Sequence, residues 1–175
     1  ANQENTNHHQ VVTEVASLKR SAGNVVLLNA GNDEAGNGQL KYDASISKGS
    51  ADNYKIIYKG NVKIGIITGA GPASEINLLA SRLKKDQKCH LVVCLSQRGY
   101  KLRTGNDDIS LAGGSQYLDI IIGGDPKNCA KNPVVVLNKD NAEVIIDHAA
   151  SAASSLGKIA VTVNDRGQKF NIAFS

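Results

Sequence analysis

The sequence has no methionine and no tryptophan, and aromatic residues make up only 4% of it. We therefore expect a core built mainly from valine, isoleucine, leucine and alanine. No apolar run approaches the roughly 20 residues that cross a bilayer, so the sequence predicts no transmembrane segment. Because even the first residue is not methionine, we expect a processed or trimmed chain, which is compatible with removal of a secretory signal.

Cysteine is also scarce, and the three cysteines leave at least one unpaired within a monomer. Cys89 and Cys94 share an expected strand, which predicts that they point to opposite faces and lie too far apart to form a disulfide. Their spacing with Cys129 matches no zinc site. We interpret all three as small apolar core residues, and a pairing that involves Cys129 stays open.

Charge of either sign is spread along the chain, with 21% charged residues and a formal net charge of +4. This pattern is typical of a solvated surface and predicts no nucleic-acid partner. Nucleotide-binding loops are missing too: no Gly-Lys-Ser or Gly-Lys-Thr occurs, and Gly69-Ala70-Gly71 lacks the third glycine of the dinucleotide fingerprint. We interpret that segment as a plain turn between a strand and a helix.

The length of 175 residues is enough for one domain with its own core. We expect residues 1–10, which are polar and aperiodic, to form a frayed tail, and residues 11–175 to form a single domain. Apolar patterning predicts helices over 11–22, 73–86 and 107–112, a hairpin over 54–68, and strands over 24–30, 89–95, 117–124, 133–137, 142–147, 157–163 and 168–174. Residues 33–50 lack a period and are predicted as an unusually long loop. This order of elements predicts a layered α/β or α+β sandwich.

Two apolar strands, 89–95 and 117–124, end abruptly in polar loops. Strands of this kind lie inside a sheet that is covered on both faces, and ligands bind beyond their ends. The loop after the first strand contains Gln97, and the loop after the second contains Asp125, Lys127 and Asn128. The sequence therefore predicts a site where these loops meet.

The histidines and serines form no recognisable catalytic motif. His8 and His9 fall in the expected tail, while His90 and His148 fall in apolar strands, where a structural role is commoner than metal binding. Ser96 ends a strand, but its sequence neighbours offer no base, and no Gly-x-Ser-x-Gly elbow occurs. Spacing alone leaves a Ser–His–acid triad open.

Four segments follow one another in an order that is characteristic of one family. They are NVVLLNAGN (Asn24–Asn32), NVKIGIIT (Asn61–Thr68), LVVCLSQRGY (Leu91–Tyr100) and LDIIIGGDPKN (Leu118–Asn128). Together they resemble the N-terminal metallophosphoesterase domain of secreted 5′-nucleotidases and cyclic-nucleotide phosphodiesterases. In that family the corresponding segments contain Leu-Asp-Ala-Gly-Asp, Lys-Ile-Gly-Ile-Ile-Gly, Leu-Ser-His-Leu-Gly and Gly-Gly-His-Ser-His-Thr.

The resemblance implies a truncated four-layer αββα sandwich, in which the family holds two metal ions between its sheets. Its metal ligands are Asp, Asn and His, and this sequence departs from them. Asn32 stands at the bridging aspartate, Gln97 at a metal-binding histidine, and Asp125 and Lys127 at the two histidines of the last loop. The family's Asp-x-His and Gly-Asn-His-Glu segments are not recognisable.

The resemblance therefore implies a non-catalytic relative that has lost its dinuclear metal site and acts as a binding or accessory protein. Its remnant cleft would consist of Asn32, Gln97, Asp125, Lys127 and Asn128, with no catalytic residue, no metal and no cofactor. The alternative is a phosphoric ester hydrolase with an atypical site, in which Asn32, Gln97 and Asp125 bind Mg²⁺ or Ca²⁺, or the site takes Mn²⁺ or Zn²⁺.

A third interpretation is a subunit that docks onto a separate catalytic or nucleoside-binding chain. A small phosphorylated ligand and a secreted, periplasmic or cell-surface location are further expectations from the resemblance.

Overall fold

The computed structural model describes residues 2–31, 40–46, 53–68, 71–148, 156–166 and 168–174. Their helices are α1 (Asn2–Ser21), α2 (Ala73–Lys85) and α3 (Asp108–Gly113). The strands are β1 (Leu28–Asn29), β2 (Ala44–Ser45), β3 (Tyr54–Lys59), β4 (Val62–Ile67), β5 (Leu91–Ser96), β6 (Ile120–Gly123), β7 (Val134–Leu137), β8 (Glu143–His148), β9 (Ile159–Val163) and β10 (Lys169–Phe174). None of these helices is long and apolar enough to cross a membrane.

A six-stranded mixed sheet forms the centre of the molecule, with the strand order β3-β4-β5-β6-β8-β7. The strands β4, β5, β6 and β8 are parallel, and β3 and β7 pair antiparallel at the two edges. Every residue of β5 is buried, as the apolar run predicts for a strand covered on both faces. The carboxyl ends of the parallel strands therefore meet at one edge of the sheet.

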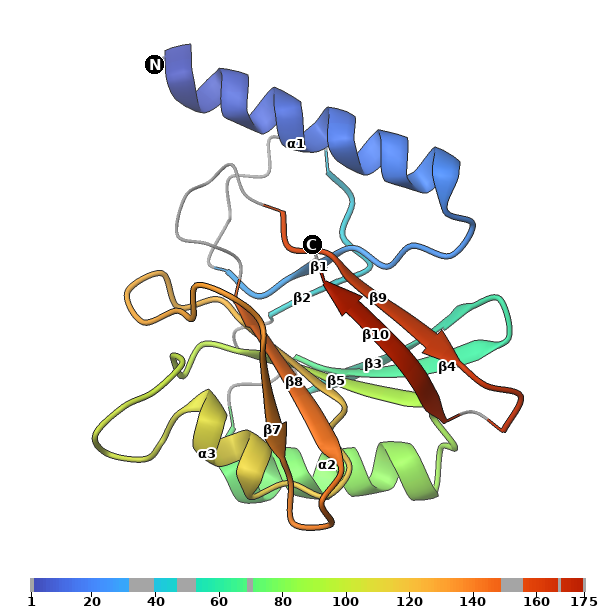
Figure 1. The fold of residues 1–175 in the computed structure, drawn as a ribbon, viewed down its shortest axis with the longest axis vertical. Helices are drawn as coiled ribbons and strands as arrows, with labels where there is room; N and C mark the ends of the chain where they lie inside the picture. The colour runs from blue at the N-terminus through green and yellow to red at the C-terminus, as the bar shows by residue number, and fades with distance from the viewer. Residues whose placement is uncertain are drawn as a thin grey trace.

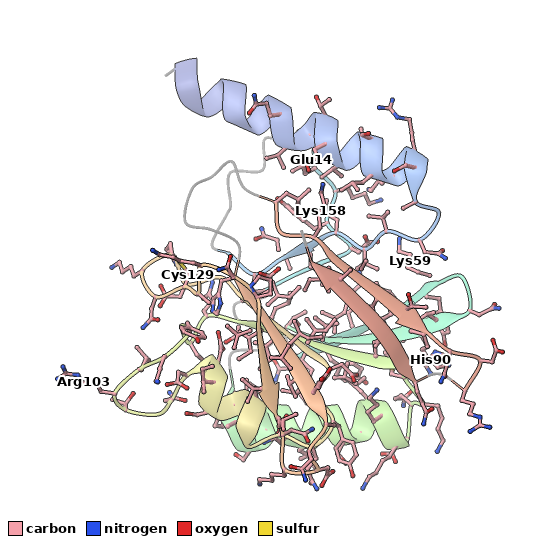
Figure 2. All side chains as sticks on the ribbon, viewed as in Figure 1. Glu14, Lys59, His90, Arg103, Cys129 and Lys158 are labelled. Atoms are coloured by element: carbon pink, nitrogen blue, oxygen red, sulfur yellow. The ribbon has the colours of Figure 1, made fainter. Side chains whose placement is uncertain are left out.

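Two smaller strand pairs form a second β layer: β1 with β2 in parallel, and β9 with β10 antiparallel. One apolar cluster lies between the sheet and α2 with α3, and a second lies between the sheet and the strand pairs. On the outside of the second layer, α1 buries Val15, and Glu14 binds Lys158 of the chain before β9 at 2.7 Å (Figure 2). Figure 1 shows the resulting order of helix, strand, strand and helix layers, which confirms the predicted αββα sandwich.

Several predicted boundaries differ from the structure. The first helix begins at Asn2 and not at residue 11, because residues 2–10 contain no glycine or proline to end it. The strand predicted over 24–30 is reduced to Leu28–Asn29. The strand β2 lies inside the predicted long loop, and local patterning does not reveal it because it forms only by pairing with β1, which is distant in sequence. The division into a tail, 1–10, and a domain, 11–175, stays a prediction.

The three cysteines are free. The prediction that Cys89 and Cys94 point to opposite faces is wrong, because Cys89 precedes β5 and both side chains belong to the cluster beneath α2. Burial raises the pKa of Cys94 to about 12, with a smaller contribution from Asp108. Both residues thus behave as the small core residues that the sequence indicates.

Candidate functional site

The predicted site residues lie at the carboxyl ends of β5 and β6, which are paired neighbours. The end of β1 approaches the same edge, because a Cβ on Gly124 would lie only 1.9 Å from the Ala30 carbonyl oxygen. The Gln97 amide also reaches that oxygen, at 3.5 Å. Asn32 lies outside the described residues. The loops after β5 and β6 therefore meet as expected, and the end of β1 joins them although it belongs to a different strand pair.

Asn128 ties the two strand-end loops together, and we name these contacts the Asn128 clasp. Its side-chain amide donates to the Lys101 carbonyl at 2.8 Å, and its side-chain oxygen accepts from the Lys101 amide at 3.3 Å. Its backbone carbonyl accepts from the Tyr100 amide at 2.8 Å. Figure 2 places the adjacent Cys129 on the opposite side of the molecule from His90, which precedes β5. The clasp thus joins the loop after β5 to the loop after β6.

Asp125 is held within its own loop. Its Oδ1 accepts from the backbone amide of Lys127 at 2.9 Å, and its Oδ2 lies beside Gly99, where an added Cβ would approach it to 3.0 Å. Gly99 has a φ of +85°, so glycine suits both its backbone conformation and the close approach. The ammonium side chain of Lys127 belongs to an exposed residue. The structure therefore brings Gln97, Asp125 and Asn128 to one edge, and leaves Lys127 on the surface.

Within the part of the chain that the structure describes, these strand-end groups do not fit the two metal ions that the resemblance implies. The donors are one carboxylate and two amides next to a lysine, whereas a dinuclear Mn²⁺ or Zn²⁺ site needs several imidazoles and carboxylates. Within the ranges that the structure describes, no group of three His, Cys, Asp or Glu side chains is arranged to hold a metal.

A buried polar cluster that sequence reasoning missed lies at the same ends of β5 and β8. The Ser96 hydroxyl donates to Oδ1 of Asp108 at 2.5 Å, and Nε2 of His148 lies 3.0 Å from Oδ2 of the same carboxylate. Both the His148 and the Asp108 side chain are fully buried. The backbone of Gly123 leaves room for the imidazole, because a Cβ there would lie 2.2 Å from Nε2.

This cluster has the components of a catalytic triad but not its order. A triad places histidine between serine and the acid, whereas here Ser96 and His148 both bind Asp108. Nδ1 of His148 is buried and has no hydrogen-bond partner among the described residues. The Tyr100 ring packs edge-on against the imidazole, with ring centroids 5.8 Å apart. The arrangement therefore positions α3 against β5 and β8, and it excludes Ser96 as a triad nucleophile in this geometry.

Asp107 explains why α3 begins where it does. Its Oδ1 accepts from the Ser110 amide at 2.8 Å, as an N-cap does, and its Oδ2 accepts from the Leu102 amide at 2.7 Å. Burial acts to raise the Asp107 pKa, but these two backbone donors, together with the Ser110 hydroxyl and the charge of Lys101, outweigh it and hold the pKa below its usual value. The cap places the next residue, Asp108, beneath His148.

No family model and no curated protein matches the sequence. Among solved structures, the NAD nucleotidase NadN of Haemophilus influenzae is similar with a TM-score of 0.71 and 17% identity, over 96% of this chain and 48% of that one. The 5′-nucleotidase precursor of Thermus thermophilus has a TM-score of 0.59 and 19% identity, over 90% and 34%. The sulfate thiohydrolase SoxB of the same organism has a TM-score of 0.50 and 17% identity, over 70% and 24%.

The described chain thus spans about half the length of NadN and about a third of the Thermus 5′-nucleotidase precursor. At such low identities the TM-scores establish the fold alone, and this fold agrees with the layers and with the four sequence segments. The protein has the metallophosphoesterase-like fold of the 5′-nucleotidases.

Proposed function

We propose that this protein is a non-catalytic 5′-nucleotidase-like domain that has lost the dinuclear metal site and acts as a binding or accessory protein. The Asn128 clasp is the observation that carries the proposal. Asn128 binds the backbone of the neighbouring strand-end loop at Lys101, and Asp125 binds the backbone of its own loop at Lys127. These contacts fix the orientation of both side chains, and one carboxylate with one amide does not replace the imidazoles of the family's metal site.

Lys127 adds to this argument. The resemblance puts it in place of a metal-binding histidine, and an ammonium group repels a divalent cation at short range. Gln97, in place of another histidine, offers an amide that reaches the Ala30 carbonyl. Amides do not replace the imidazoles and bridging carboxylate that activate water between two metal ions.

Calorimetric titration with Mn²⁺, together with hydrolysis of a nitrophenyl phosphodiester, tests the proposal. We expect no stoichiometric binding, no turnover and an unchanged melting temperature. A metal at about 100 times its dissociation constant would stabilise the fold by roughly 2.7 kcal/mol. A shift of that size that disappears in Asp125→Ala would contradict the proposal.

Restoring single ligands provides a second test. Gln97→His, or Asp125→His combined with Lys127→His, should leave the protein folded and inactive, because one or two histidines cannot hold a metal whose other ligands are missing. Recovery of turnover by one substitution would mean that the rest of the metal site is intact.

The alternative function is a phosphoric ester hydrolase that uses a divalent metal in an atypical site. One observation favours it: His148 is held by a carboxylate through one nitrogen, and its other nitrogen has no partner among the described residues. Metal-bound and catalytic imidazoles are commonly oriented by a carboxylate in this way. Turnover with Mg²⁺, Ca²⁺, Mn²⁺ or Zn²⁺ that is lost in a His148→Asn variant that is still folded would select this alternative.

A separate nucleoside-binding or catalytic chain is the partner that we propose, at a secreted, periplasmic or cell-surface location. The similar structures are longer chains, of which this one matches 48% and 34%. Fractionation of the native cells followed by size-exclusion chromatography tests both points. Elution of the protein from the cytoplasmic fraction at its own mass of 18.4 kDa would contradict them.

A further inference from the structure

The edge strand β7 of the central sheet leaves a row of backbone groups open. It lies on the opposite side of the sheet from β3, the other edge strand (Figure 1). The Ile145 amide of β8 donates to the Asp119 carbonyl before β6, so the backbone of Ile145 is turned away from Val135, its partner in the register with β7. Val135 and, two residues on, Leu137 therefore direct their N–H and C=O groups outward, away from β8.

The side chains of the same two residues are exposed as well. Val135 is 48% exposed and Leu137 is 57% exposed. Val136 between them packs against the cluster beneath α2 and α3, so the alternation along the strand turns its two neighbours to the other face of the sheet. Among the described strands, β7 pairs with β8 alone. Apolar side chains and open backbone groups thus occur together, which is the combination that another β-strand fills.

The opposite edge of the sheet is protected against such pairing. The strand β3 carries Lys55 and Lys59, and lysines on an edge strand oppose pairing with another chain. Both bind Asp43 before β2: Nζ of Lys59 lies 3.2 Å from its carboxylate, and Nζ of Lys55 donates to its carbonyl at 2.7 Å. The four residues of β7 carry no charge. Of the two edges, β7 is therefore the one that accepts a strand.

We propose that β7 pairs antiparallel with β7 of a second copy of this chain, about a two-fold axis at Val136. This register sets Val135 opposite Leu137 of the second copy, and the reverse, so the outward residues of the two copies exchange their N–H···O bonds. Pro133 has no N–H group, and the Lys139 amide is already bonded within its own chain, so the ladder ends after these two pairs. The strand is complementary to itself, and such an isologous contact closes at two copies.

Sedimentation equilibrium of the full chain tests this pairing. A contact through one short strand is small, and interfaces below about 1,200 Å² form weak complexes. We therefore expect the mass to rise from 18.4 kDa toward twice that value between micromolar and millimolar concentration. Val135→Lys or Leu137→Glu alone should weaken the dimer at least about tenfold, because each sets a charge against an apolar side chain. The two changes together should restore association, because the register sets the introduced lysine opposite the introduced glutamate of the other copy.

Leu78→Lys is the control, since Leu78 lies on α2, is 62% exposed and should leave the dimer unchanged. Amide NMR of the wild-type protein gives a readout that depends on no variant. Raising the protein concentration should shift the amide signals of Val135 and Leu137 and leave those of β3 in place. A mass that stays at 18.4 kDa at millimolar concentration, species larger than a dimer, shifts confined to β3, or a double variant that stays monomeric would each overturn the proposal.

Discussion

His148 and Asp108 meet where solvent is excluded, because both side chains are fully buried. Removing one member of a buried pair costs about 3–5 kcal/mol, since the other is left without its partner. We expect His148→Leu to lower the free energy of unfolding by this amount in urea denaturation. Asp108→Asn combined with His148→Leu should cost less than the sum of the single changes, because the two groups interact.

His90 is the control for that prediction. It is half-buried, and its Nδ1 accepts from the Lys63 amide at 2.8 Å, so His90→Leu should cost only about 0.5–1.5 kcal/mol. Equal losses for the two histidines would mean that the Asp108 contact adds nothing to stability.

The lowered pKa of Asp107 makes the free energy of unfolding depend on pH. Its pKa is lower in the folded chain than in the unfolded one, so its stabilisation is present above the unfolded value of about 3.9 and is lost as the pH falls through the folded value. Asp107→Asn keeps a capping side chain but cannot titrate. The acid-dependent loss below about pH 4 should therefore be smaller in Asp107→Asn than in the wild type, when unfolding free energies are measured across that range. The exposed Asp165→Asn should keep the wild-type profile.

Contacts between individual side chains were the feature that the sequence predicted least well. The sequence places Ser96 at a strand end, but nothing in it assigns Asp108 as the partner, because the contact depends on where the short helix α3 packs. The predicted Gln97, Asp125 and Asn128 do gather at one edge, since strand polarity follows from the alternation of strands and helices. What the sequence could not give is the direction in which each side chain points.

At the level of elements, Gly123 and Gly124 leave room at the end of β6 for the His148 imidazole and the Ala30 carbonyl. A Cβ on Gly124 would lie 1.9 Å from the backbone oxygen of Ala30, which cannot move without shifting the end of β1. We expect Gly124→Ala to destabilise the fold by at least about 1–3 kcal/mol in denaturant titrations. Gly113→Ala is the matched control, because its Cβ would meet nothing nearer than 3.9 Å and should be neutral or slightly stabilising. A neutral Gly124→Ala would mean that β1 does not hold its position against β6.

Elements with their own strong pattern were predicted well. The hairpin of β3 and β4, with its turn at Gly60, and the helix α2 have nearly the predicted bounds. The two-residue strands β1 and β2 were mispredicted, because strands this short carry no periodicity and exist through pairing across a long stretch of chain.

For the whole molecule, the layers predict unequal local stability. The central strands β5, β6 and β8 are covered on both faces, whereas β1 with β2 and β9 with β10 are only two-stranded pairs. We expect hydrogen exchange followed by mass spectrometry to give the slowest amides in the central strands and faster exchange in both pairs. Uniform protection across the two β layers would contradict a core centred on the larger sheet.

The Asn128 clasp has an energetic consequence for any ligand that needs the strand-end edge open. Its two side-chain hydrogen bonds to Lys101 are each worth about 0.5–1.5 kcal/mol, so the open form is disfavoured by roughly 1–3 kcal/mol. Only the open fraction is competent to bind, and the apparent affinity falls by the same factor, roughly 5- to 150-fold. Asn128→Ala would remove these two hydrogen bonds, so it should raise the apparent affinity of such a ligand by the same factor.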